Sequence, residues 1–237
     1  MWLGDRRRIR LSLSNRSLSL MLPESPCVLI VVHNNCFTEF AGVEKETFSL
    51  VRWLTKKHPD KRILLYSYDF PENKHVLHCI RKGKMEVTGE YKSGTSPDTI
   101  LKRLLGTFDI KLAVIEHLQW HSLNYLSLLE NSGIRIFMYI HEFFYYCPYP
   151  YMPVPQRVKG ENRNIVCDIT RADCGTCSGM DNFPEIDIIE WRKKVKSALL
   201  SEFVTVCFVS EFVRDNYVKM FNLGSKKEYT VSYPDFL

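Results

Sequence analysis

The sequence has no apolar segment long enough to cross a membrane as a helix, because its longest purely apolar runs, such as Val28–Val32, are the length of a strand. It also shows no internal repeat. Residues 1–26 are rich in Ser, Leu and Arg, but serines interrupt the leucines, so we expect no secretory signal there. This segment is instead predicted to be a basic flexible leader or linker, with attachment to a surface as the alternative. A cytoplasmic protein is therefore expected.

Outside this leader the chain has little net charge. The formal charge is +5, and the leader holds five arginines against two acidic residues, which leaves only +2 for residues 27–237. Domains that bind nucleic acid usually gather positive charge on one face, so no nucleic-acid partner is expected. With 45% hydrophobic and 25% charged residues, the composition is that of an ordinary globular protein. Residues 27–237 are long enough for one domain with a substantial core.

Apolar strands alternate with amphipathic helices after the leader. Strands are predicted at 27–32, 62–67, 85–91, 110–116, 134–140, 203–209 and 229–232, and helices at 42–58, 75–81, 97–105, 122–131, 186–200 and 211–221. A long Cys-rich insertion, residues 141–183, separates two of these elements. This order predicts an α/β fold with a Rossmann-like, doubly wound parallel sheet.

Two predicted strands end in residues suited to binding or chemistry. The first is followed by His33 and Asn34 and then by Ala41-Gly42-Val43, where a helix begins. A glycine and a helix N-terminus at the carboxyl end of a strand can bind a phosphate through backbone N–H groups, although Gly42 is also consistent with a plain helix start.

The strand at 134–140 runs into His141 and Glu142, and the strand before it is followed by His117. A histidine beside a carboxylate can donate or accept a proton near neutral pH, so His141 and Glu142 are the candidate catalytic residues. The alternative is a histidine that only hydrogen-bonds locally at a strand end.

Four cysteines lie together in the insertion: Cys147, Cys167, Cys174 and Cys177. The last two form a Cys-x-x-Cys pair, which structural zinc sites favour, so a structural zinc is one interpretation. Disulfides and plain thiols are the alternatives. A redox dithiol fits less well, because the pair does not open a helix after a first strand.

The order of these motifs resembles the N-terminal domain of family 4 glycosyltransferases, which have the GT-B fold. The resemblance rests on these motifs: Ala-Gly-Val-Glu after the first strand, His-Glu followed by aromatics and Cys-Pro, a Cys-x-x-Cys, and Glu190-Trp191-Arg192 before Ser210-Glu211. The family usually has Gly-Gly-Val-Glu where this chain has Ala41, and His-Asp where it has Glu142. The resemblance extends from about residue 27 to residue 234.

This resemblance implies a nucleotide sugar as co-substrate and no catalytic metal. The loop at Ala41, Gly42 and Val43 would contact the donor diphosphate, and His141 would face the donor sugar. His33, Asn34 and His117 would line the cleft, with His117 nearer the acceptor. The acceptor would be a glycan or a lipid-linked glycan, made in polysaccharide or glycoconjugate biosynthesis.

The resemblance also implies a C-terminal GT-B domain, in the same chain or in a partner subunit, and the chain ends directly after a predicted strand. A basic run near Trp53 and Lys61 gives peripheral membrane contact as an alternative to a solvated face. The alternative function is a non-catalytic, zinc-stapled α/β module that binds a glycan or a protein.

Overall fold

The structure is a computed structural model of the 237-residue chain. It describes residues 26–39, 41–91, 94–147 and 187–224, and the backbone alone of residues 10–12, 153–158, 161–166 and 230–231. Of the expected leader, Arg10–Ser12 forms strand β1, which pairs in parallel with β5, and residues 1–9 and 13–25 lie outside the described part. Among the described residues, no helix is both long and apolar enough to cross a bilayer.

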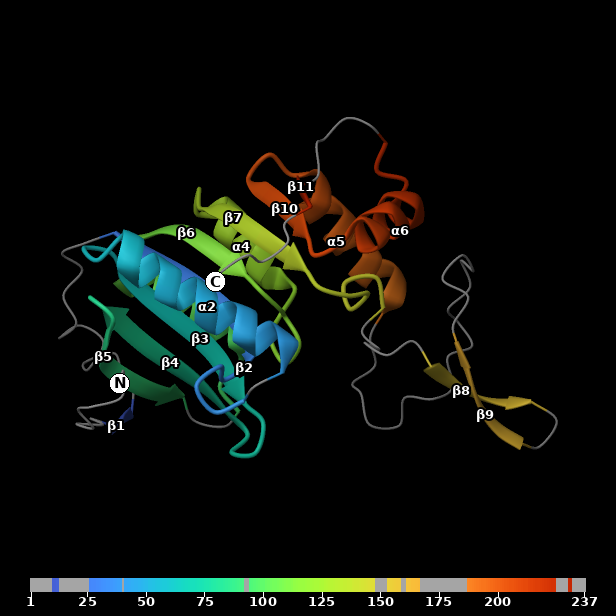
Figure 1. Cartoon of the computed structure of the whole chain (residues 1–237). Helices are drawn as coiled ribbons and strands as arrows, with labels where there is room; N and C mark the ends of the chain where they lie inside the picture. The colour runs from blue at the N-terminus through green and yellow to red at the C-terminus, as the bar shows by residue number, and fades with distance from the viewer. Residues whose placement is uncertain are drawn as a thin grey trace.

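A nine-stranded mixed sheet, mostly parallel, forms the centre of the fold (Figure 1). Its strands run in the order β1-β5-β4-β3-β2-β6-β7-β10-β11. The bounds are β1 Arg10–Ser12, β2 Cys27–Asn34, β3 Arg62–Asp69, β4 Lys74–Arg81, β5 Lys84–Tyr91, β6 Ile110–Ile115, β7 Arg135–Ile140, β10 Val204–Phe208 and β11 Thr230–Val231. A separate hairpin, β8 Pro153–Val158 and β9 Glu161–Val166, lies within the predicted insertion.

The prediction of a helix at residues 75–81 is wrong, and so is that of a wholly parallel sheet. Strand β4 occupies this segment and pairs antiparallel with β3 and with β5. The buried apolar residues Val76, Leu77, Cys79 and Ile80 have a spacing that suits a helix as well as a strand buried on both faces. The two-residue turn at Lys82-Gly83, with φ angles of 50° and 68°, closes the β4–β5 hairpin.

Five helices lie in the described part of the chain, and they cover the two faces of the sheet unequally. They are α2 Gly42–Lys57, α3 Pro97–Thr107, α4 Asn124–Asn131, α5 Ile188–Leu200 and α6 Glu211–Phe221. Helix α2 crosses one face (Figure 1), where Leu50 and Val51 pack against Ile30 of β2 and Leu65 of β3. Helices α3 to α6 contribute to the core of the opposite face. The predicted apolar face of α2 is confirmed, since its central residues are buried.

This winding creates a switch point between β2 and β6. From β2 the chain crosses by α2 to β3 on one side, and it later enters β6 on the other side. Strands β2, β3, β6, β7 and β10 are parallel, so their carboxyl ends meet at one edge of the sheet. Ligands of open α/β sheets bind outside the carboxyl ends of strands at such a point.

Candidate functional site

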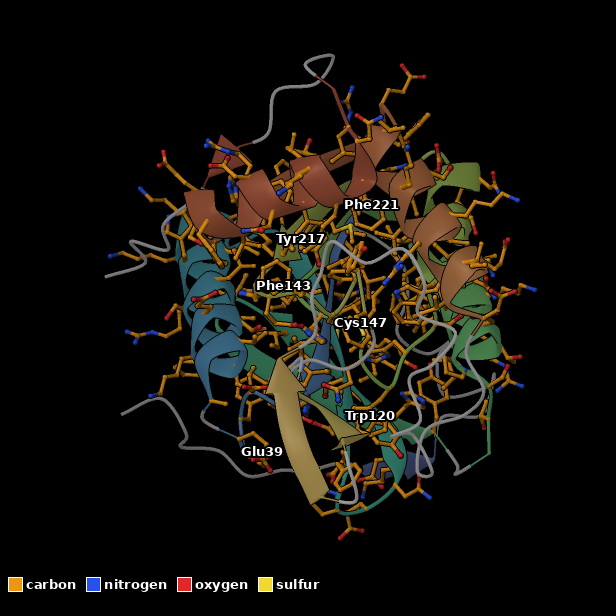
Figure 2. All side chains as sticks on the ribbon, turned by 90° about the vertical axis from the view of Figure 1, so that its right-hand side faces the viewer. Glu39, Trp120, Phe143, Cys147, Tyr217 and Phe221 are labelled. Carbon is orange, nitrogen blue, oxygen red and sulfur yellow. The ribbon has the colours of Figure 1, made fainter. Side chains whose placement is uncertain are left out.

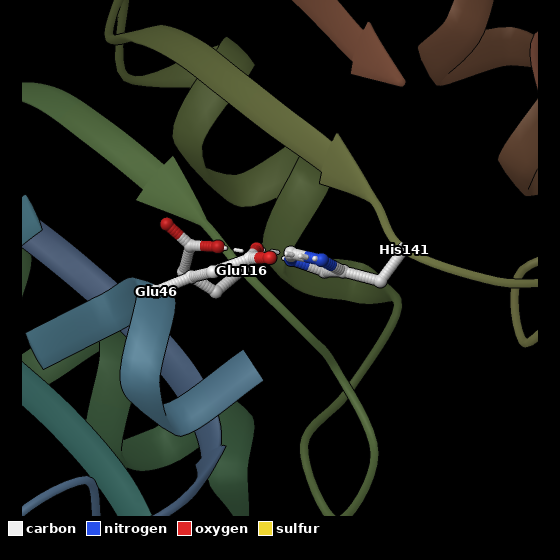
Figure 3. Close-up of side chains that lie close together, drawn as sticks. All are labelled: Glu46, Glu116 and His141. Carbon is white, nitrogen blue, oxygen red and sulfur yellow. Dashed lines mark hydrogen bonds and ion pairs between the residues drawn. The ribbon is translucent and has the colours of Figure 1, made fainter. Parts of the chain in front are cut away.

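His141 follows β7 at this carboxyl edge and is held between two carboxylates (Figure 3). Its Nε2 lies 3.0 Å from Oε2 of Glu116, directly after β6, and its Nδ1 lies 3.1 Å from Oε2 of Glu46, in the second turn of α2. The side chains of His141 and Glu116 are 8% and 4% exposed, whereas that of Glu46 is 29% exposed. An imidazolium can donate to both carboxylates at once, so this geometry suits the charged form of His141.

The electrostatic balance favours the same form. Burial lowers the pKa of His141, but hydrogen bonds and charge attraction from Glu116 and Glu46 outweigh it and raise the pKa to about 9. Burial also raises the pKa of Glu116, against the hydrogen bond and charge of His141. His141 is therefore a fixed cation at neutral pH and a poor general base.

His33 and Glu44 form a second pair beside this one. Nε2 of His33, at the end of β2, lies 3.2 Å from Oε1 of Glu44 in the first turn of α2, and Glu44 is completely buried. The His33 ring also lies 4.4 Å from the ring of His117, centroid to centroid. Burial, followed by the neighbouring His117, lowers the pKa of His33 to about 4, so His33 is neutral at pH 7.

His117 and Glu142 form the third pair. The amide N–H of Gln119 donates to Nδ1 of His117 (3.1 Å), so Nε2 carries the proton and donates to Oε1 of Glu142 (2.9 Å). Burial, with the charge of His141, lowers the pKa of His117 to about 3. Burial raises the pKa of Glu142 to about 7, against the backbone N–H groups of Phe144 and Phe143. This carboxyl can hold or release a proton near neutral pH.

Helices α5 and α6 fix the segment after β7, which carries Glu142. The Trp191 indole N–H donates to the Tyr145 carbonyl oxygen (3.0 Å), and Nε of Arg192 donates to the Tyr146 carbonyl oxygen (3.1 Å). The Tyr217 hydroxyl of α6 donates to the Glu142 carbonyl oxygen (2.9 Å). Figure 2 shows Tyr217 near Phe143 and Phe221 beneath α6, and the Tyr217 and Phe143 rings stack at 5.9 Å. The Trp-Arg pair therefore acts as an anchor for the candidate site.

The N-terminus of α2 lies open at the same edge. Its N-cap residue is Ala41, which offers no side-chain hydrogen bond, whereas Ser96, Asp187 and Ser210 cap α3, α5 and α6 with their side chains. Ala41 and Gly42 are exposed, and a Cβ added at Gly42 would meet no atom within 4 Å. No side chain of the described residues caps α2, so its first N–H groups can bind an anion. Val43 is instead half-buried and packs on the core beneath α2.

Among the described residues, the group that could hold a metal ion is His141 with its two carboxylates, and it contains no cysteine. One ligand atom each from Glu46, Glu116 and His141 lie within 4.8 Å of one another, a spacing that could hold a cation. Cys147 is buried. Cys167, Cys174 and Cys177 lie outside the described residues, so a zinc at the four cysteines stays a prediction.

The structure brings together His33, His117, His141 and Glu142. It adds three carboxylates that the sequence analysis did not name as site residues, those of Glu44, which ends the Ala-Gly-Val-Glu motif, Glu46 and Glu116. Asn34, at the end of β2, is half-buried and has no role in these three pairs. Glu44 and Glu46 lie two positions apart at the start of a predicted helix, and three predicted strands end in histidines. This pattern was the sequence signal that could have indicated pairs of a histidine and a carboxylate.

Comparison of the chain with protein-family models, with curated proteins and with solved structures gives no match. The function is therefore argued from the arrangement of the site and from the order of the sequence motifs.

Proposed function

We propose that this chain is the acceptor-side half of a GT-B glycosyltransferase, which transfers a sugar from a nucleotide sugar to a glycan or lipid-linked acceptor. One observation carries the proposal: three histidines from the carboxyl ends of three adjacent parallel strands converge beside an uncapped helix N-terminus, at the switch point of the sheet. Ligands bind at that point in open α/β sheets. The motif order given above supplies the class of reaction.

The leaving diphosphate would bind the free N–H groups of α2 at Gly42, where the positive end of the helix dipole stabilises negative charge as the glycosidic bond breaks. The transition state of such a transfer is oxocarbenium-like. His141 would donate from Nδ1 to the donor sugar, because Glu46 is the more exposed of its two partners and is the one a ligand can displace. Glu116 would keep the imidazole oriented and charged.

The His117–Glu142 pair lies beside this position and would face the acceptor. Glu142, whose pKa burial raises to about 7, is poised to accept or return a proton of an acceptor hydroxyl. His33, kept neutral by burial, would serve as a hydrogen-bonding wall of the cleft. A second GT-B domain, in cis or in a partner, would hold most of the nucleotide, and the enzyme would work in the cytoplasm or at the inner face of a membrane.

The test compares the natural gene product with its His141→Ala variant. The assay detects nucleoside diphosphate released from a panel of UDP-, GDP-, ADP- and dTDP-sugars, with a glycan and lipid extract of the source cells as acceptor. We expect release by the wild type and a loss of about 100-fold or more in the variant, as for removal of a group that stabilises transition-state charge. His58→Ala is the matched control, since His58 is exposed at the C-terminal end of α2.

Two results would remove the proposal. One is the absence of release from every donor by the wild-type protein. The other is a His141→Ala variant that stays folded and releases diphosphate at the wild-type rate.

A further inference from the structure

Tyr68, Phe70 and Trp120 form an exposed aromatic group at the carboxyl edge of the sheet. The Trp120 ring stacks on Tyr68 at 5.9 Å and lies 5.2 Å from Phe70, centroid to centroid. Phe70 is 61% exposed and Trp120 is 37% exposed, so solvent reaches both rings. Figure 2 shows Trp120 well apart from the group of Phe143, Tyr217 and Phe221 under α6. We name these three residues the aromatic platform.

Two tight turns bring the rings together. In the first, the Asn73 N–H donates to the Phe70 carbonyl oxygen (3.2 Å), and in the second the His121 N–H donates to the Leu118 carbonyl oxygen (3.0 Å). Trp120 is the third residue of the second turn and has a φ of 66°, a conformation that favours Gly or Asn. Strain of this kind is concentrated at functional sites, because folding alone would favour a different residue there.

Among the described residues, those next to Tyr68 and Phe70 in the chain are mostly acidic. Asp69 is the last residue of β3, and its Oδ1 accepts from the N–H of Glu72 in the β3–β4 turn (3.1 Å). Lys74 pairs with Glu72 (3.6 Å) and Glu90 (3.2 Å). Three carboxylates and one ammonium group make binding to an anionic membrane surface unfavourable. Proteins that bind such surfaces usually have basic residues around their apolar anchors. The same carboxylates are acceptors suited to hydroxyl donors.

The platform adjoins the candidate site through the segment between β6 and α4. Trp120 lies three residues after His117 in this segment, and Nε2 of the next residue, His121, donates to the carbonyl oxygen of Val32, which precedes His33 (2.9 Å). A ligand that covers the platform can therefore extend along the sheet edge towards the histidines.

We propose that the aromatic platform binds a sugar ring of a neutral glycan, with the C–H face of the pyranose against Trp120 and hydroxyls donating to Asp69 and Glu72. Aromatic faces bind apolar C–H surfaces, and carboxylates select hydroxyl donors over anionic groups. That this glycan is the acceptor rests on the proposed function, but the binding itself does not.

The experiment applies labelled wild-type protein to a microarray of neutral and anionic glycans and then titrates the best neutral ligand by calorimetry. Trp120→Gly removes the ring and suits the positive φ, so this variant keeps its fold. Trp53→Ala is the matched control, because Trp53 is similarly exposed, at 43%, but lies on α2. We expect Trp120→Gly to weaken binding at least about tenfold and Trp53→Ala to leave it unchanged.

Three results would overturn the inference: no wild-type binding to any neutral glycan, equal binding by Trp120→Gly, or Trp120-dependent binding only to phosphatidylglycerol vesicles. The two proposals fail separately. If the protein binds a glycan through Trp120 but releases no diphosphate from nucleotide sugars, the platform proposal stands and the transferase proposal fails. Release that depends on His141, together with equal glycan binding by the wild type and Trp120→Gly, retains the transferase and removes the platform.

Discussion

The charged state of His141 is set by two carboxylates, and removing one charge tests this directly. Glu116→Gln keeps the size of the side chain and an oxygen that can accept from Nε2, but it removes the negative charge 3.0 Å from the imidazole. The rise of the His141 pKa from 6.5 to about 9 corresponds to roughly 3 kcal/mol of preference for the imidazolium, net of burial. We therefore expect the variant to lower the pKa of His141 by at least about one pH unit.

The pKa is measured from the side-chain nitrogen resonances of His141 in long-range proton–nitrogen correlation spectra between pH 5 and about 10. His75 is an internal contrast, because burial lowers its pKa to about 4 and Glu116 is not among the causes. Glu72→Gln is the matched control variant, since Glu72 is 66% exposed and pairs with Lys74 instead.

The stability follows from the same pKa. A folded-state pKa above the unfolded value adds stability that is fully present below pH 6.5 and is lost as the pH rises through about 9. Urea unfolding of the wild type should therefore show a fall between pH 7 and 9 that Glu116→Gln reduces. If His141 of the wild type titrates at or below 6.5, or titrates equally in both proteins, the reasoning is refuted.

Two further predictions concern acid and helix capping. Burial lowers the pKa of His75 to about 4, so its contribution to stability is present above pH 6.5 and lost as the pH falls towards 4; between pH 7 and 5 the free energy of unfolding by urea should fall by roughly 2 kcal/mol more in the wild type than in His75→Gln, and an equal fall in both proteins would contradict this. Asp187→Ala removes the side chain that accepts from the N–H groups of Ile189 and Glu190, each at 3.0 Å, and should cost about 1 kcal/mol of stability by thermal unfolding, whereas Glu202→Ala should change little.

Much of the fold could be predicted because local patterns specified it. The helix predicted from residue 97 begins there as α3, where Ser96 accepts from the Thr99 N–H, and α6 has the predicted bounds. The strand β4 could not be predicted in this way. Its apolar residues are buried on both faces, so no period of two marks it, and only pairing with β3 and β5 selects a strand.

In the candidate site, too, some features could be predicted from the sequence and others could not. The positions of His33, His117 and His141 after strands were predictable, because a short apolar run followed by a polar residue marks a strand end. Their partners were not, since Glu116 and Glu46 meet His141 only through the order of the strands and the crossing of α2. The aromatic platform was likewise hidden, because Phe70 and Trp120 are far apart in the sequence and meet through two turns.

The sequence by itself determined most of the strands and helices through local apolar patterns, and it placed three histidines at one edge of an α/β sheet. Only the tertiary structure decided which carboxylate faces each histidine, and hence that His141 is a cation while His33 and His117 are neutral. The physical reason is that hydrophobic periodicity is local, whereas burial and the distance between charges depend on how distant elements pack.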